Sequence, residues 1–453
     1  MKHLAKYLCA ALILVLAAAT AVAEVKLDTV FQYRTLIQQV QGTGCLIVES
    51  KQDNLRGLFT TAGAEIIPCA YKSIDSLSYG FFSAYNDKEA VDGRALWTVG
   101  GHMIGKAEYG GFKVFNSRWV AAFVVNPEEV PDAEKDIKIG SKTYQYERVD
   151  LYFVPDGADE SLAPIASLGR DAYADASVHG EYIAVTNREK AVSVYDSSFQ
   201  PVSVTLSAAN KPLYTVNKSY QLISLLTNSI LDDGYTEAAE VNLSDRMLIK
   251  ATRVALDGTK LACLMTADGT VLLPPEYEII DITDHYAVVA DQEKQQGLFS
   301  LDEARFIVPC GYSAIVPCAT DLDKYVHNGY VCVEKEEKLG FYDVVNGVES
   351  CAPKYSKRAV TIIGCSLAFT TVEGDLTIVA ADGAVNILDA DEVLVTRGNG
   401  SLLEVKKGAS FGLIDWHGNI VVPVNHYKDI VVTDDSQAII RTSTGLQLDT
   451  VTR

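Results

Sequence analysis

Apolar residues in this chain come in short runs of about four to eight positions, separated by turn-forming residues every eight to twelve positions or so. Such runs are typical of β-strands, because an amphipathic α-helix places its apolar residues three and four positions apart. Only residues 219–228 have a weak helical pattern. The pattern therefore predicts an all-β chain.

One phrase within this pattern recurs along the chain. Its clearest copy covers residues 412–423 and is followed by Tyr427, and an earlier copy covers residues 57–68 and is followed by Tyr71. Such recurrence indicates a repeat architecture, in which each unit buries its apolar face against its neighbours. The widest gap between copies places an inserted surface loop at residues 126–142. Alignment gives ten starts with a mean period of about 39 residues, at Gly57, Ala95, Leu151, Val192, Asn228, Cys263, Gly297, Gly340, Thr377 and Gly412.

Each strong copy contains glycine, proline and tyrosine at similar spacing, and we expect all three to have structural roles. A glycine adopts the positive φ that a tight hairpin turn requires. Proline lacks the N–H that a sheet ladder needs, so it should end a strand or lie on an edge strand. The tyrosine that follows is expected to pack against the sheet. These positions are Gly57, Gly63, Pro68, Tyr71, Gly269, Pro274, Tyr277, Gly297, Pro309, Tyr312, Gly340, Gly412, Gly418, Pro423 and Tyr427.

The recurring glycine, apolar pair, turn glycine, proline and tyrosine resemble the WG-repeat family, also called KWG. The resemblance covers residues 57–74 and 261–430. It implies a secreted or surface-associated bacterial repeat protein and adds little on chemistry. The chain departs from the family because the tryptophan before the glycine is replaced, by Arg56, Gln296, Leu339 and Phe411.

Two architectures fit an array of about ten such units: a β-propeller, and an open β-solenoid-type array. The chain ends favour a propeller-like arrangement. Residues 437–448 resemble an incomplete eleventh unit, and residues 30–48 precede the first hairpin. Combined into one sheet, these two ends would remove two exposed edges. The open array stays as an alternative, because one propeller ring typically has about four to eight blades.

Residues 1–23 have the features of a secretory signal peptide. Lys2 and Lys6 precede an apolar run at residues 7–19, and a small-residue cleavage site ends at Ala23. We therefore expect residues 24–453 to be exported as one repeat array, without a membrane span after signal cleavage. An uncleaved membrane anchor is the alternative.

The net charge of −20 repels phosphate backbones, so nucleic acid is not an expected partner. The cysteines beyond the signal form no Cys-x-x-Cys pair, which argues against structural zinc. They fit small buried hydrophobic residues, although export would permit disulfides. These cysteines are Cys45, Cys69, Cys263, Cys310, Cys318, Cys332, Cys351 and Cys365.

The sequence contains no Gly-x-Ser-x-Gly, His-Glu-x-x-His or phosphate-binding glycine motif, and we assign no catalytic residue, metal or cofactor. Asp343 and Asp415 recur before the hairpin turn, where a carboxylate would accept turn N–H groups. Acidic clusters at residues 321–323, 389–392 and 434–435 leave Ca²⁺ as an alternative ligand, but none has the spacing of a known calcium loop.

Trp416 and His417 are the candidate binding residues, because they are the part of the clearest copy that does not recur. Trp416 should lie on a hairpin turn. There it would form an exposed platform for a sugar or peptide, or pack against an adjacent repeat.

The leading functional hypothesis is an exported, non-enzymatic repeat protein that presents a binding or scaffold surface to protein or polysaccharide partners. The alternatives are a propeller-type glycan hydrolase or lyase and a structural protein of the cell envelope.

Overall fold

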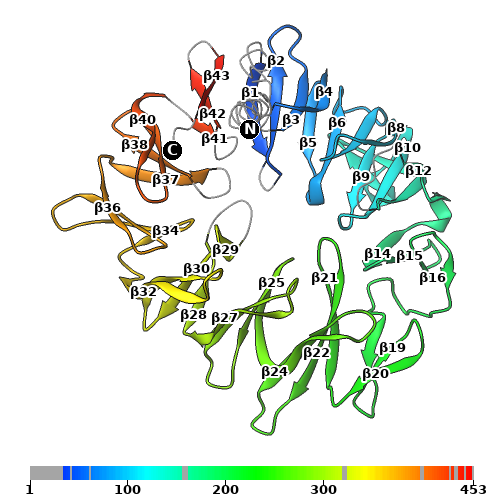
Figure 1. The fold of residues 1–453 in the computed structure, drawn as a ribbon. Helices are drawn as coiled ribbons and strands as arrows, with labels where there is room; N and C mark the ends of the chain where they lie inside the picture. Colours follow the sequence, from blue (N-terminus) through cyan, green and yellow to red (C-terminus); the bar gives the residue numbers. More distant parts are fainter. Residues whose placement is uncertain are drawn as a thin grey trace, which may run out of the picture.

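Short antiparallel strands, joined in sequence order, make up the chain (Figure 1). The computed structural model describes residues 34–40, 43–60, 63–155, 162–318, 324–397, 402–427, 430–432, 437–442 and 445–450, so the expected signal peptide lies outside the described residues. Within these ranges there is no α-helix, and three short 3-10 segments occur, η1 (Ser78–Gly80), η2 (Asp132–Glu134) and η3 (Arg170–Ala172). The prediction of an all-β fold is confirmed.

The strands form small antiparallel sheets, which are named A to K in chain order. Sheet A contains β1 (Arg34–Val40), β2 (Cys45–Ser50), β3 (Arg56–Thr60) and β4 (Glu65–Tyr71), and sheet B contains β5 (Ser73–Ser76), β6 (Phe81–Tyr85), β7 (Arg94–Thr98) and β8 (Met103–Tyr109). Sheet C contains β9 (Gly111–Val114), β10 (Trp119–Glu129), β11 (Ile137–Ile139), β12 (Lys142–Phe153) and β13 (Ala166–Gly169), and sheet D contains β14 (Asp175–His179), β15 (Tyr182–Thr186), β16 (Val192–Tyr195) and β17 (Pro201–Val202).

The middle of the chain continues this order. Sheet E contains β18 (Tyr214–Val216), β19 (Gln221–Ser224) and β20 (Ser229–Asp233), and sheet F contains β21 (Glu237–Asn242), β22 (Met247–Val254), β23 (Lys260–Met265) and the first part of β24 (Val271–Ile282). Sheet G contains the second part of β24, β25 (Tyr286–Ala290), β26 (Gln296–Ser300) and β27 (Arg305–Tyr312), and sheet H contains β28 (Ala314–Val316), β29 (Val326–His327), β30 (Tyr330–Lys335), β31 (Lys338–Asp343) and β32 (Val348–Ser356).

The C-terminal part has the same organisation. Sheet I contains β33 (Thr361–Ile363), β34 (Ser366–Thr370), β35 (Leu376–Ala380) and β36 (Val385–Leu388). Sheet J contains β37 (Glu392–Arg397), β38 (Leu402–Lys407), β39 (Ser410–Asp415) and β40 (Ile420–Tyr427), and sheet K contains β41 (Ile430–Val432), β42 (Gln437–Thr442) and β43 (Gly445–Thr450).

The repeat phrase corresponds to a defined part of these sheets. Each of the ten starts lies in the third main strand of a sheet, or directly before it at Asn228. From each start, the chain forms a hairpin turn, then the fourth strand of the sheet, and then enters the next sheet. Strand β24 shows this passage without a break, because its first part pairs with β23 and its second part pairs with β25.

The sheets follow one another around a common centre, and the first and last described strands approach each other (Figure 1). Strand β1 lies beside β43. We expected strands from both ends to share one sheet. Instead, β1 pairs with β2 in sheet A, and the described strands of sheet K all come from the C-terminal end, while residues 30–33 lie outside the described residues.

The hydrophobic core is divided among the interfaces between neighbouring sheets. Buried clusters join A to B, B to C, C to D, D to E and F, F to G, G to H, H to I, I to J and J to K. In β25, Ala287 and Val289 face sheet F, whereas Val288 faces sheet H. Because both faces of such a strand are buried, its sequence is a continuous apolar run without alternation.

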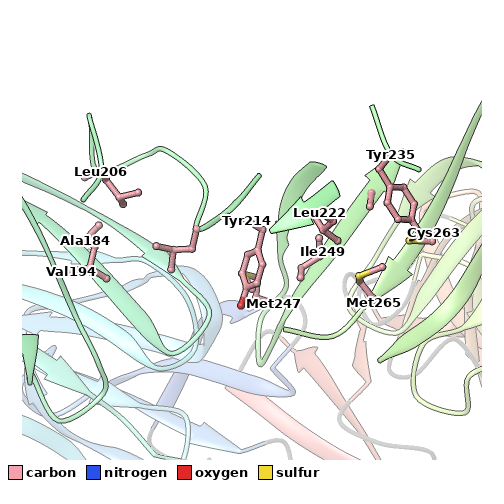
Figure 2. Packing of buried hydrophobic residues seen from close by; sticks show 13 residues of the cluster. Ala184, Val194, Leu206, Tyr214, Leu222, Tyr235, Met247, Ile249, Cys263 and Met265 are labelled. Carbon is pink, nitrogen blue, oxygen red and sulfur yellow. Dashed lines mark hydrogen bonds between the residues drawn. The ribbon is translucent and has the colours of Figure 1, made fainter. Parts of the chain in front are cut away.

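Sheet E contributes little to this core (Figure 2). In the cluster that joins D, E and F, its strands supply Tyr214 and Leu222, whereas β22 and β23 of sheet F supply five buried side chains, Met247, Ile249, Ala251, Cys263 and Met265. The first strands of sheets D and F, β14 and β21, also lie close to each other. Sheet E is therefore a thin unit between two larger ones.

The recurring glycine and proline face each other across a β-bulge. In sheet G, Gln296 pairs with Tyr312 and Leu298 pairs with Val308, so three residues including Pro309 lie opposite Gly297. A methyl group on Gly297 would lie 2.8 Å from the carbonyl oxygen of Val308. Three residues also lie opposite Gly57 and Gly340, and four lie opposite Gly412.

The bulge explains how the recurring proline fits inside its strand. Of the two alternatives for the proline, the edge position is confirmed, because Pro68, Pro309 and Pro423 lie on edge strands. The other alternative is wrong, because these prolines and Pro274 lie inside their strands and do not end them. The bulge leaves the proline nitrogen out of the ladder, so its missing N–H leaves no pairing gap. The tyrosine then resumes pairing at the residue before the glycine, as Tyr71 does with Arg56.

The hairpin glycines have the predicted conformation. Gly63, Gly269 and Gly418 have φ values of 86°, 90° and 93°. In the last of these turns, the N–H of Gly418 donates to the carbonyl of Asp415, and the N–H of Asp415 donates to the carbonyl of Asn419. This pattern is a three-residue hairpin loop that ends in a left-handed glycine.

The weak helical pattern at residues 219–228 is overturned. This segment contains β19, which pairs with both β18 and β20. Tyr220 and Asn228 have φ values of 63° and 53°, so the backbone on both sides of the strand is left-handed and cannot continue a right-handed helix.

Residues 126–142, for which we expected a surface loop, are largely ordered by strand pairing. Strand β10 continues to Glu129, and β11 pairs with the start of β12. Ile139 is buried with Val125 and Tyr144 in a small cluster. The alternating isoleucines Ile137 and Ile139 are a signal for this short strand, but the charged residues around them make the segment resemble a loop.

Candidate functional site

The turn between the first and second strands of a sheet and the turn between its third and fourth strands lie at the same end of the sheet, because successive strands are antiparallel. Contacts between sheets bring these turns together, and we call the surface that they form the turn face. In sheets C and F, the N–H of Ser117 donates to the carbonyl of Ser244 at 3.2 Å. In sheets F and G, the N–H of Ser244 donates to Oδ1 of Asp284 at 2.9 Å.

Trp416 and His417, the residues singled out from the sequence, lie on this turn face in sheet J. The Trp416 ring is half-buried in the cluster between H and I, with its centroid 5.5 Å from that of Tyr330. Nε2 of His417 lies 2.9 Å from Oδ2 of Asp382 in sheet I. Of the two alternatives for Trp416, this geometry favours packing against adjacent repeats.

The aspartates before the hairpin turns have the expected structural role. Oδ1 of Asp415 accepts the N–H groups of His417 and Asn419, at 2.9 and 2.8 Å. Oδ1 of Asp343 accepts those of Val345 and Asn346, both at 2.9 Å. Hydrogen bonds from the Asn346 backbone and side chain lower the pKa of the Asp343 carboxyl.

A buried charge pair lies where sheets D and F meet. His179, the last residue of β14, places Nδ1 2.5 Å from Oε2 of Glu240 in β21. Their side chains are 4% and 6% exposed. Nε2 of His179 lies 2.7 Å from the carbonyl of Ala209, and Oε1 of Glu240 accepts the N–H of Leu213 at 2.5 Å. The pair therefore also fixes the connection between sheets D and E.

The protonation of this pair follows from its partners. The Ala209 carbonyl only accepts, so Nε2 of His179 carries a hydrogen, and a second proton lies between Nδ1 and the carboxylate. Burial disfavours the charged imidazolium, but the hydrogen bond and charge of Glu240 outweigh this effect and raise the pKa of His179.

A cavity of about 460 Å³ opens beside this pair on the turn face, and we call it the turn-face hollow. It has two arginines, Arg118 and Arg246, and two tyrosines, Tyr182 and Tyr214. Its volume falls in the range of small-molecule pockets, about 300–1,000 Å³. It is lined by Asn116, Arg118, His179, Gly180, Glu181, Tyr182, Tyr214, Asp245, Arg246, Met247, Leu248, Thr266 and Ala267.

Charges in the turn-face hollow are balanced by nearby carboxylates. Nη1 of Arg118 lies 2.9 Å from Oε1 of Glu181, and Nη2 of Arg246 lies 2.5 Å from Oδ1 of Asp302. The Nε of Arg246 is buried and has no hydrogen-bond partner within the structure. Tyr214 is buried, so only the Tyr182 ring is partly exposed to the hollow. Balanced charge combined with this ring suits a neutral, polar ligand.

A second cavity, of about 480 Å³, lies between β14 and β21 on the other side of His179. Asn116 and His179 line both cavities. Asn116 is itself fixed, because its Oδ1 accepts the N–H groups of Arg118 and Trp119 at 2.9 and 2.7 Å. The wall between the cavities is thus held by buried hydrogen bonds.

No local motif points to this site. Its residues come mostly from the turns of sheets C, D and F, with Tyr214 from sheet E. These segments lie far apart in the chain and fall in or next to the least regular repeats. A histidine, a glutamate and paired arginines are common on surfaces, so only their assembly distinguishes them. The one signal in the sequence was that the repeat phrase is poorly kept between residues 95 and 261. Functional sites often depart from the residue pattern of the surrounding scaffold.

Among the described ranges, no group of three or more His, Cys, Asp or Glu side chains could hold a metal ion. In the acidic segment 389–392, Asp389 pairs with Lys407 and Asp391 accepts the N–H of Gly408. Residues 321–323 and 434–435 lie outside the described residues. No described helix is long and apolar enough to cross a membrane.

No protein-family model matches the sequence, and no curated protein sequence matches it. Among solved structures, the chain is similar to a eukaryotic initiation factor, at 8% identity and a TM-score of 0.33, over 84% of this chain and 95% of that one. It is also similar to BamB from Moraxella catarrhalis, at 12% identity and a TM-score of 0.18, over 63% and 95%. The computationally designed Ika8 protein gives 9% identity and a TM-score of 0.22, over 63% and 97%. Because these TM-scores are low, the similarities support no functional assignment.

Proposed function

We propose that this chain is an exported, non-enzymatic binding protein, and that the turn-face hollow takes a neutral carbohydrate segment. The observation that carries the proposal is the combination of the partly exposed Tyr182 ring with charge-balanced arginines in one cavity. A sugar hydroxyl both donates and accepts hydrogen bonds, so it can bind a guanidinium and its neighbouring carboxylate together. The apolar face of a sugar ring packs on an aromatic ring.

Export and a propeller-like array are parts of this proposal. The signal-like residues 1–23 and the resemblance to WG repeats support an exported or cell-surface location. The proximity of β1 and β43 supports a ring. N-terminal sequencing of the chain recovered from its host should find Glu24 first. A chain that retains residues 1–23 would contradict cleavage.

Binding is tested with the purified chain and a panel of neutral oligosaccharides and cell-wall glycan fragments. The Tyr182→Ala variant should weaken binding at least tenfold, about 1.4 kcal/mol, because Tyr182 lines the hollow. The matched control is Tyr220→Ala, since Tyr220 is an exposed tyrosine that does not line the hollow. Its affinity should equal that of the wild type.

Three other results would overturn the proposal in distinct ways. If Trp416→Ala abolishes binding and Tyr182→Ala does not, the ligand binds at Trp416 and His417. If the chain cleaves a glycan, and Glu181→Gln or Asp245→Asn stops the cleavage, the chain is a hydrolase or lyase. If no glycan binds, the hollow is not a carbohydrate site, and a protein partner or a structural role in the cell envelope replaces the proposal.

A further inference from the structure

Strand β36, the outer strand of sheet I, has one edge without a strand partner. It pairs with β35, and no other described strand pairs with it. It lies at the outside of the array, away from the common centre (Figure 1). The N–H and C=O groups on its outer edge are therefore open to pairing with another extended chain.

The outer strands of the other sheets have features that oppose such pairing. Proline, charged side chains and β-bulges on an edge strand all disfavour the addition of a further strand. Proline occurs in β4, β17, β24, β27, β32 and β40, and charged residues occur in β8, β20 and β43. The exposed residues of β13 are Ser167 and Gly169. Strand β36 has the sequence Val-Asn-Ile-Leu, without proline or charge, and its register with β35 has no shift.

The exposed side chains of β36 are aliphatic. Val385 is 54% exposed and Ile387 is 68% exposed. Side chains two positions apart along a strand point to the same face, so these two form one apolar face beside the open edge. Leu388, by contrast, is buried between sheets I and J. The strand is thus anchored through Leu388 and leaves its other apolar side chains uncovered.

A cavity of about 330 Å³ lies between β36 and sheet J, and we call it the rim pocket. Its wall includes Ile387, Leu388, Ile420 and Pro423. Ile420 is 63% exposed, so an aliphatic side chain that entered this pocket would cover two exposed isoleucines. Peptides that add a strand to a sheet edge gain affinity from main-chain hydrogen bonds and specificity from pockets for alternate side chains. Strand β36 and the rim pocket together offer both.

Carboxylates lie at both ends of this strand. Asp382 precedes β36, and Asp389 and Asp391 follow it. Lys407 pairs with Asp389 at 2.5 Å, whereas Asp391 accepts the backbone N–H of Gly408, which is neutral. The negative charge at the ends is therefore only partly balanced, and basic residues on a partner would complement it.

The same charges disfavour a second copy of the chain as the occupant. If two β36 strands paired antiparallel over their full length, Asp382 of one copy would lie opposite Asp391 of the other. Like charges directly opposite each other destabilise a strand pair. Each copy also has a net charge of −20.

We infer that β36 binds an extended segment of another protein by strand addition, and that this segment has alternate aliphatic residues between basic ends. Its backbone pairs with the open edge, one aliphatic side chain enters the rim pocket, and its basic ends lie near the aspartates. This surface is separate from the turn-face hollow, because none of its residues lines that cavity.

The inference is tested by titrating the purified full chain into three labelled nine-residue peptides and measuring fluorescence anisotropy. Each peptide has valine, isoleucine or leucine at three alternate central positions, threonine between them and two lysines at each end. At least one should bind saturably. N-methyl groups on its middle aliphatic residue and on the next threonine remove N–H donors from both peptide edges, so they should weaken binding at least tenfold. Glutamates in place of the lysines should weaken it at least tenfold as well, and added salt should reduce this difference.

Two variants of the chain locate the binding surface. Ile387→Lys should weaken binding at least tenfold, because it removes an apolar contact and repels the lysines of the peptide. Val254→Lys is the matched control: Val254 is 48% exposed, but its strand β22 lies between β21 and β23 and has no open edge. Its affinity should equal that of the wild type. The N-methyl comparison uses the wild-type chain, so it decides the question even if a variant fails to fold.

Several results would overturn the inference. These are no binding of any of the three peptides, equal binding of the N-methylated or glutamate-ended peptide, and unchanged binding by Ile387→Lys. A dimer in sedimentation velocity that Ile387→Lys abolishes would instead assign the edge to a second copy. Because the peptides and variants do not involve the turn-face hollow, none of these outcomes bears on carbohydrate binding.

Discussion

At the scale of single residues, the repeat phrase encodes a glycine that faces a proline bulge. The bulge moves the proline out of the ladder, and the close approach of its backbone leaves no space for a side chain on the glycine. The tyrosine that follows restores the register. The three residue types therefore depend on one another through contact across two neighbouring strands, which explains why they recur together.

Alanine substitution in sheet G measures the cost of filling this space. A methyl group on Gly297 would lie 2.8 Å from both the Val308 oxygen and the Cys310 nitrogen, so Gly297→Ala should lower the free energy of unfolding by about 1–3 kcal/mol. Gly311→Ala is the matched control in the same sheet, because no atom lies within 4 Å of its added methyl group. It should change stability by less than about 0.5 kcal/mol. Equal urea midpoints for the two variants would refute the packing argument.

At the scale of elements, each sheet depends on its neighbours, and the His179–Glu240 pair joins two sheets across a thin one. Sheet E supplies few core residues, so direct contact between β14 and β21 stabilises this part of the array. Removing one member of a buried charge pair typically costs about 3–5 kcal/mol. His179 of this pair lines both cavities, so the junction that stabilises the array also shapes the candidate site.

The pair predicts a pH dependence of stability. The pKa of His179 is raised in the folded chain. The pair therefore adds its full share to the free energy of unfolding below the pKa of the unfolded chain, about 6.5. This stabilisation is lost as the pH rises through the pKa of the folded chain. Urea unfolding should therefore show stability declining above about pH 6.5, and His179→Gln should reduce this decline.

A second histidine–carboxylate pair supplies the control for this measurement. His285 and Asp302 form an ion pair at 2.9 Å, but their side chains are 58% and 49% exposed. His285→Gln should therefore keep the wild-type pH profile, because exposed pairs contribute little. If His179→Gln also keeps that profile, the buried pair does not control the pH dependence.

At the scale of the whole molecule, stability is distributed over a chain of interfaces without one central core. This distribution is expected for repeat arrays, in which each unit contacts only its neighbours. The ends are then the weakest units, because an end sheet has fewer partners. Here the C-terminal sheet K packs on sheet J and also lies beside β1.

Placing a charge at the J–K interface tests this organisation. Ile430 is fully buried in that interface, so Ile430→Asp should destabilise sheet K by at least about 2 kcal/mol and make residues beyond 430 the first target of limited proteolysis. Ile420→Asp is the matched control, because Ile420 is 63% exposed. It should leave the cleavage pattern unchanged. Equal patterns in the two variants would show that sheet K is not held by this interface.

Much of the fold could be predicted, because its signals are local. Turn glycines such as Gly418 and the apolar runs between turns place the strands within a few residues. The errors arose where pairing overrode the local pattern. Residues 219–228 form a strand because β18 and β20 pair with them, and Pro309 stays inside its strand because a bulge accommodates it.

The candidate site, unlike the strands and turns, could not be predicted from local patterns. Sequence reasoning favoured Trp416 and His417 because they did not recur, whereas the structure packs Trp416 against Tyr330 and assembles a hollow elsewhere. The residues of that hollow are ordinary in their local context. They become a site only through hydrogen bonds between turns of sheets C, D and F.

The sequence by itself determined the strand content, the repeat period and the turn conformations, because each depends on residues within one hairpin. Only the tertiary structure decided which sheets meet. It brought β14 against β21, buried His179 beside Glu240, and opened the turn-face hollow next to them. These contacts join residues about sixty positions apart, where packing between sheets sets the geometry and no local pattern records it.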